Sequence, residues 1–192
     1  MAKIKTSAPQ HYARIKYNRP NAPAVISQAL LDLRSAPIVP EDLLVLCIGT
    51  DRSTGDSLGP LIGTNLLKRT PPFLVFGSLD QPVHAANLPE TLEKIKLKSP
   101  KWTVAIDASL GNVDGVGNVN IGQGPLKPGA GVNKTLPRVG DVYITGIVNV
   151  GGFMEYFVLQ NTRLSLVVKM ADVICTGIME AFATEKKMAG YY

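Results

Sequence analysis

Three short apolar runs separated by amphipathic stretches constrain most strongly what this chain can fold into. The runs span residues 43–48, 73–77 and 102–106, and a continuous apolar run is typical of a strand buried on both faces of a parallel sheet. The stretches between them, 58–69 and 85–98, repeat their apolar residues at helical spacing. This alternation predicts an α/β fold, a three-layer sandwich with a mostly parallel central sheet.

The rest of the chain extends the same pattern. Two further strands and three further helices are expected, at 116–121 and 142–150 and at 24–33, 153–159 and 164–184. The sequence has no internal repeat and no interdomain linker, and its 192 residues suit one sizeable domain. We therefore expect a single α/β domain over residues 24–192.

The positive charge of the chain is concentrated near its start. Its formal net charge is +5, and the first twenty residues hold five cations and no acidic residue: Lys3, Lys5, Arg14, Lys16 and Arg19. Residues 1–23 are therefore expected to form a peripheral basic leader. Such a leader either binds nucleic acid or an acidic partner through counterion release, or serves only as a solubilising segment. Because the remainder is neutral overall, nucleic acid is not the expected partner.

The same sequence features indicate where the protein works. No apolar run approaches the roughly 18–20 residues of a membrane span, and the charged N-terminus lacks the apolar core of a secretory signal. The two cysteines, Cys47 and Cys175, lie in apolar surroundings without a metal or disulfide spacing. A cytoplasmic protein that does not act at a membrane is expected.

Polar residues follow the first and third predicted strands, where ligands bind in open parallel sheets. Asp56 lies in the loop after the first strand, and Asp107 directly follows the third. Two neighbouring carboxyl groups cannot both ionise easily, so they can act as acid and base on a water molecule, or they can share a divalent metal. The competing structural roles are a helix cap for Asp56 and a turn residue for Asp107.

Other loop residues add to this candidate site. His84, after the second strand, could complete a metal site or could be an ordinary surface histidine. The glycine- and proline-rich loop 122–131 could approach a ligand closely, or could be a flexible connection. The first loop contains neither a phosphate-binding P-loop nor a dinucleotide-binding motif, and neither cysteine has a histidine signature that would make it a nucleophile.

Two motifs resemble the spore germination protease family. They are the loop Gly-Thr-Asp-Arg-Ser-Thr-Gly-Asp-Ser-Leu-Gly-Pro at 49–60 and the strand Val-Ala-Ile-Asp-Ala at 104–108. The segment Lys-Pro-Gly-Ala-Gly-Val at 127–132 is similar to the glycine-rich segment of that family. From about Val45 to the last helix, the chain resembles the YyaC-type sporulation protein family most closely. Hydrogenase maturation peptidases look like more distant relatives that share the fold and the acidic positions.

This resemblance implies a phosphorylase/hydrolase-like, germination-protease-like fold. It implies catalytic roles for Asp56 and Asp107, and we expect substrate-binding roles for the loop residues around them, which are Asp51, Ser57, Gly129 and Gly131. In the maturation peptidases the acidic residues hold a metal beside a later histidine. Since this chain shows no obvious histidine at that later position, neither a metal nor another cofactor is expected.

The expected function is a sporulation-associated, peptidase-like activity that hydrolyses peptide bonds with an aspartate pair. The expected partner is a protein or peptide substrate, with small spore proteins as candidates, in the cytoplasm of the sporulating cell or the spore interior. A homo-oligomer is left open. The alternative is a non-catalytic binding or regulatory protein of sporulation that retains the cleft.

Overall fold

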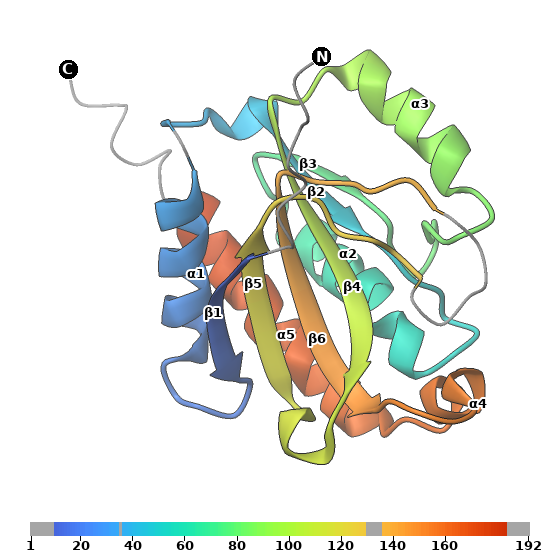
Figure 1. Ribbon diagram of the computed structural model, residues 1–192. Coiled ribbons are helices and arrows are strands. Elements are labelled where there is room, and N and C mark those ends of the chain that lie inside the picture. Colours follow the sequence, from blue (N-terminus) through green and yellow to red (C-terminus); the bar gives the residue numbers. More distant parts are fainter. Residues whose placement is uncertain (1–9, 35, 130–135, 184–192) are drawn as a thin grey trace, which may run out of the picture.

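The fold is built on one six-stranded sheet, seen here in a computed structural model that describes residues 10–34, 36–129 and 136–183. The strands follow the order β1-β5-β6-β4-β2-β3 across the sheet. Four neighbouring strands, β6, β4, β2 and β3, are parallel, whereas β5 is antiparallel to β6 and β1 is antiparallel to β5. Their bounds are β1 (Gln10–Lys16), β2 (Leu43–Cys47), β3 (Leu74–Phe76), β4 (Trp102–Gly111), β5 (Asn118–Gln123) and β6 (Val142–Val150) (Figure 1).

Helices cover both faces of this sheet and so make three layers. One apolar core joins the sheet to α1, α2 and α5, and a second, smaller core joins the other face to α3. A further helical segment, α4, lies at the carboxyl ends of the parallel strands (Figure 1). The helices are α1 (Ala22–Leu33), α2 (Leu58–Lys68), α3 (Leu88–Lys98), α4 (Glu155–Gln160) and α5 (Leu164–Phe182). The predicted three-layer sandwich with a mostly parallel sheet is confirmed.

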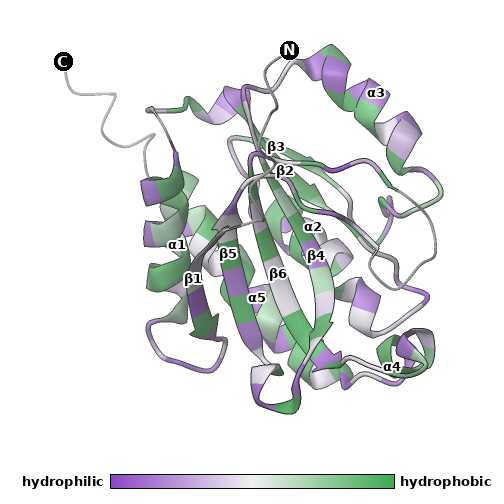
Figure 2. Ribbon diagram, in the orientation of Figure 1, coloured by the Kyte–Doolittle hydropathy of each residue, from purple (hydrophilic) through white to green (hydrophobic). Residues whose placement is uncertain are grey.

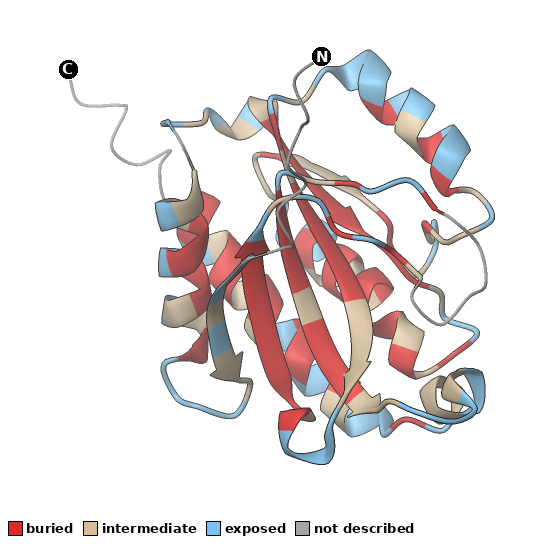
Figure 3. Ribbon diagram, viewed as in Figure 1, coloured by how far each residue is buried: buried red, intermediate tan, exposed pale blue. Residues whose placement is uncertain are grey.

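The run of β2 is continuously apolar because both faces of this strand are buried, as the sequence predicts. All five of its residues are buried, with Leu43, Val45 and Cys47 in the core under α2 and α5, and Leu44 and Leu46 in the core under α3. The central strands and α5 are accordingly rich in hydrophobic residues, whereas α3 has a largely hydrophilic surface (Figure 2). The buried residues gather in the same central strands (Figure 3). Within the described residues, no helix is long and apolar enough to span a membrane.

The expected leader is wrong where it overlaps β1. Residues 10–16 form an edge strand paired with β5, so residues 10–23 are not a separate peripheral segment. Residues 1–9 lie outside the described part. The concentration of cations near the start of the chain favoured a leader, whereas the strand is held by Ala13 and Ile15, which pack against the core. The two cations of β1 form hydrogen bonds with neighbouring segments: Arg14 Nε donates to Asn120 Oδ1 at 2.7 Å, and Lys16 Nζ donates to the carbonyl of Val116 at 2.6 Å. Charged residues on an edge strand also discourage pairing with other chains.

The glycine in the Leu-Gly-Pro sequence at the start of α2 lets this helix pack directly on the end of β2. A side-chain carbon at Gly59 would overlap the carbonyl oxygen of Ile48. We expect Gly59→Ala to lower the free energy of unfolding by about 1–3 kcal/mol, because the helix must move away from the strand. Urea denaturation measures this change. Lys68→Ala, at an exposed position of the same helix, is the control, and equal effects of the two changes would contradict this packing role.

Candidate active site

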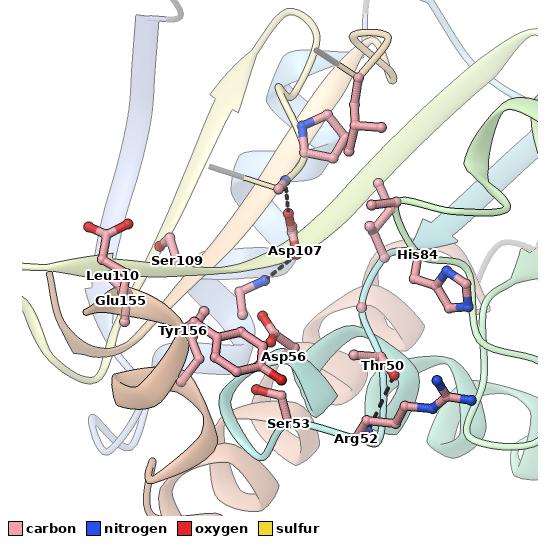
Figure 4. A pocket seen from close by; sticks show the side chains of 18 residues that line it. Thr50, Arg52, Ser53, Asp56, His84, Asp107, Ser109, Leu110, Glu155 and Tyr156 are labelled. Atoms are coloured by element: carbon pink, nitrogen blue, oxygen red, sulfur yellow. Dashed lines mark hydrogen bonds between the residues drawn. The ribbon is translucent and has the colours of Figure 1, made fainter. Parts of the chain in front are cut away.

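A pocket of about 370 Å³ lies at the carboxyl ends of the parallel strands. It is the position at which open α/β sheets bind their ligands. Its walls come from the loop after β2, the segment after β3, the last part of β4, the loop after β5, and α4 (Figure 4). The polar side chains among its lining residues belong to Thr50, Arg52, Ser53, Asp56, His84, Asp107, Ser109, Glu155 and Tyr156.

Asp107 reaches this pocket because β2 ends earlier than β4. Pairing between these strands stops at Cys47 and Ile106, whereas β4 continues along β6 as far as Gly111. The expected end of the third strand at residue 106 is therefore too early, because pairing with β6 extends it. Asp107 is the first β4 residue beyond its pairing with β2, and its side chain faces the pocket (Figure 4).

The carboxyl group of Asp107 is buried, with 9% of the residue exposed. One oxygen accepts the N–H of Ala108 at 2.8 Å and the other accepts the N–H of Gly129 at 3.3 Å. Burial, the largest cause, and the nearby charge of Asp56 together raise the pKa of Asp107 to about 7, although the two N–H donors lower it. Asp107 is therefore a carboxylic acid that keeps its proton up to nearly neutral pH.

Asp56 lies on the opposite wall, in a short helical turn (Gly55–Ser57) that leads into α2. Its side chain points into the pocket toward Asp107 (Figure 4). The capping alternative is not what the structure shows, since no side-chain cap hydrogen bond forms at the start of this turn or of α2 in the described chain. Burial raises the pKa of Asp56, and the adjacent Ser53 hydroxyl opposes that rise.

Ser53 is the one pocket residue whose hydroxyl is both buried and unsatisfied. The residue is 5% exposed, and Ser53 Oγ has no aligned hydrogen-bond partner among the residues that the structure describes. It lies close enough to Asp56 to favour the ionised carboxylate. The hydroxyls of Thr50 and Ser109 differ, since Thr50 Oγ1 accepts the N–H of Arg52 at 3.3 Å and Ser109 Oγ donates to the carbonyl of Gly146 at 3.3 Å.

The structure brings together only part of the predicted substrate-binding set. Gly129 lines the pocket and donates to Asp107, whereas Gly131 lies outside the described residues. Asp51 is exposed and does not line the pocket. Ser57 is also absent from its walls, because its buried hydroxyl donates to the carbonyl of Thr54 at 2.7 Å.

His84 lies at the pocket, as its place after the second strand suggested, without forming a metal site there. Its Nδ1 accepts the N–H of Ala86 at 3.2 Å. Across the described part of the chain, no three or more histidine, cysteine, aspartate or glutamate side chains are grouped so that they could hold a metal ion. The pocket presents the carboxyl groups of Asp56, Asp107 and Glu155 together with the His84 imidazole and neighbouring hydroxyl groups.

One wall of the pocket comes from α4, which the sequence did not indicate as part of the site. Glu155, Tyr156 and Leu159 line the pocket, and the helix packs closely on the Asp56 turn, where a side-chain carbon at Gly55 would lie 2.7 Å from Leu159 Cδ2. The predicted helix at 153–159 is present but begins later, at Glu155. Large apolar side chains remain exposed around it, including Phe153 with 89% exposed and Phe157 with 51% exposed. This aromatic cluster was the available signal, because such residues seldom remain exposed without a binding role.

Comparisons with known proteins identify a similar fold and the family of this chain. The fold is similar to the crystal structure of the NiFe-hydrogenase maturation protease HycI from Thermococcus kodakarensis KOD1, with a TM-score of 0.54 and 20% identity over 81% of this chain and 99% of that chain. This likeness concerns the fold alone. The chain is also 53% identical over 163 residues to the protein described as "Uncharacterized protein YyaC" from Bacillus subtilis (strain 168), which covers 84% of this chain and 77% of that protein. The family model described as "Protein of unknown function (DUF1256)" matches residues 14–177, and the chain therefore belongs to the DUF1256 family.

Proposed function

We propose that this protein is a peptidase that hydrolyses peptide bonds of a protein or peptide substrate with Asp56 and Asp107. One observation carries the proposal: two partly desolvated carboxyl groups, those of Asp56 and Asp107, face one pocket, and burial raises the pKa of Asp107 to about 7. Below its pKa, Asp107 is the protonated acid, and Asp56, whose carboxylate the Ser53 hydroxyl favours, is the base. General acid–base catalysis needs such an unequal pair.

The proposed reaction needs only water as a second substrate. The Asp56 carboxylate takes a proton from a water molecule as the water oxygen forms a bond to the peptide carbonyl carbon. The carbon–nitrogen bond then breaks, and the Asp107 proton moves to the leaving nitrogen. The products are a carboxylic acid and an amine. Transfer of the proton from Asp56 to Asp107, directly or through solvent, restores the starting state.

The biological setting is part of the proposal. The motifs at 49–60 and 104–108 resemble those of the spore germination protease family, which supports a role in the sporulating cell or spore interior, with small spore proteins as candidate substrates. The exposed aromatic residues next to the pocket support a substrate that presents apolar side chains.

A cleavage assay with spore protein extract tests this function. The full chain is incubated with the extract at a series of pH values below about 7, where Asp107 keeps its proton, and new peptide fragments are identified by mass spectrometry. We expect fragments that increase with time and are absent with the Asp107→Asn variant. If purified spore proteins bind saturably and remain uncut, the non-catalytic binding alternative replaces the peptidase.

Tyr156 provides a test of substrate binding that is separate from the chemistry. Its ring lines the pocket and packs edge-on against Phe157, with ring centroids 5.7 Å apart. We expect Tyr156→Ala to raise KM for an apolar peptide substrate about tenfold with little change in kcat, because apolar contact area is lost away from the carboxyl groups. Steady-state kinetics measure both constants. Leu97→Ala, at a residue with 85% exposed on α3, is the control; a fall in kcat at constant KM would contradict the binding role of Tyr156.

A further inference from the structure

We infer that Ser53 holds the hydrolytic water: its hydroxyl and the carboxyl groups of Asp56 and Asp107 form a binding site for one water molecule. This inference rests on the proposed function for the role of that water, although the site itself is argued from geometry alone. The three side chains line the same pocket and come from two segments, the loop after β2 and strand β4 (Figure 4).

The first argument is the unsatisfied hydroxyl. Buried polar side chains nearly always have a hydrogen-bond partner, and leaving one unpaired costs stability. Ser53 Oγ is buried without a partner among the described protein groups, and it borders a space large enough for several water molecules. A molecule in the pocket therefore offers this hydroxyl a better-aligned partner than the adjacent Asp56 carboxylate does.

The second argument is the local backbone, which fixes where Ser53 points. The carbonyl of Ser53 accepts the N–H of Ser57 at 3.1 Å, so residues 53–57 form one tight turn. Ser53 and Asp56 stand three residues apart in this turn, and their side chains lie on the same wall of the pocket (Figure 4). The turn therefore presents a hydroxyl donor and a carboxylate acceptor side by side.

The third argument is the number and kind of partners. An ordered buried water makes about three hydrogen bonds. Here a water can accept the Ser53 hydroxyl proton and donate one hydrogen to the Asp56 carboxylate, with the second directed at the Asp107 carbonyl oxygen. Of the other pocket hydroxyls, those of Thr50 and Ser109 already have backbone partners, and that of Tyr156 accepts from Gln160 Nε2 at 3.0 Å. This arrangement places the hydrolytic water beside its base, and the side-chain carbonyl oxygen of Asp107, which accepts one backbone N–H, keeps a second lone pair for the water.

Crystal structures of the wild type and of Ser53→Ala, at a resolution that shows ordered water, test the site directly. We expect a water within hydrogen-bond distance of Ser53 Oγ and both carboxyl groups in the wild type, and its loss or displacement in the variant. Absence of that water from the wild type, or the same water in the same place in the variant, would overturn the inference.

Kinetics of the same variant test what the water does. We expect Ser53→Ala to lower kcat about ten- to hundredfold with KM nearly unchanged, because the attacking water is less well placed. Ser78→Ala is the matched control. Ser78 is a buried serine outside the pocket whose Oγ accepts the N–H of Gln81 at 3.1 Å, and its removal should leave kcat unchanged while lowering stability.

The outcomes separate this inference from the proposed function. If the variant loses the water and keeps its kcat, the water is not the nucleophile and the inference is wrong. If the wild type holds the water at Ser53 but cleaves neither spore proteins nor peptides, the water site stands and the peptidase proposal fails.

Discussion

Asp107→Asn should abolish peptide cleavage, with kcat/KM reduced by at least about a thousandfold. The amide cannot deliver the proton that the leaving nitrogen needs, and general acid–base groups typically contribute factors of about 10²–10⁴. Asp56→Asn should cause a loss of similar size, because an amide cannot take a proton from water. Because the two residues act on one reaction, the double variant should be little worse than either single variant.

The control for these substitutions is Asp114→Asn, which changes an exposed aspartate outside the pocket. Its activity should match that of the wild type. Asp107→Asn should still fold, because its remaining carbonyl oxygen can accept the N–H of Ala108 as the carboxylate does at 2.8 Å. A variant that retains a tenth of the wild-type kcat/KM would contradict the assigned role of the residue that it replaces. Unfolding of both variants, without cleavage by the wild type, would favour a structural role.

The buried acid should also make stability depend on pH in an unusual direction. The pKa of Asp107 is about 7 in the folded protein against 3.8 for the unperturbed group, so the folded state holds the extra proton between these values. The contribution to stability is fully present below about pH 4 and is lost as the pH rises through about 7, by up to about 4 kcal/mol. The raised pKa of Asp56 acts in the same direction.

Urea denaturation between about pH 4 and pH 8 measures this effect as the difference between the wild type and Asp107→Asn. The wild type should lose stability relative to the variant as the pH rises through this range, because the asparagine has no proton to lose. Asp114→Asn should follow the wild type throughout. Parallel curves for the wild type and Asp107→Asn would show that Asp107 ionises normally in the folded protein.

The sequence predicts the central sheet well because burial dictates its composition. The run 43–48 has no polar residue because both faces of β2 are covered. The edge strand β1 is not predicted in this way because one side of it faces solvent. Only its Ala13 and Ile15 side chains pack against the core, so the strand lacks a continuous apolar run. Patterns of apolar residues therefore locate central strands more reliably than edge strands.

The candidate site is predictable in part for a related reason. Strand ends indicate where polar residues can meet, and they predict that Asp56 and Asp107 face one site. The contribution of α4 and the unsatisfied hydroxyl of Ser53 depend on contacts between segments about a hundred residues apart along the chain. Ser57 shows the converse limit: its place beside Asp56 suggests substrate binding, while its hydroxyl closes the local turn by donating to the carbonyl of Thr54.

The proposed acid–base roles require that the carboxyl groups of Asp56 and Asp107 share one environment. A carbon-13 NMR titration of the aspartate side chains tests this coupling most directly. The predicted result is a titration midpoint near pH 7 for Asp107 that moves to lower pH in Asp56→Asn, because the neighbouring negative charge is gone. A midpoint near pH 4 that does not respond to Asp56→Asn would contradict both the coupling and the acid–base roles built on it.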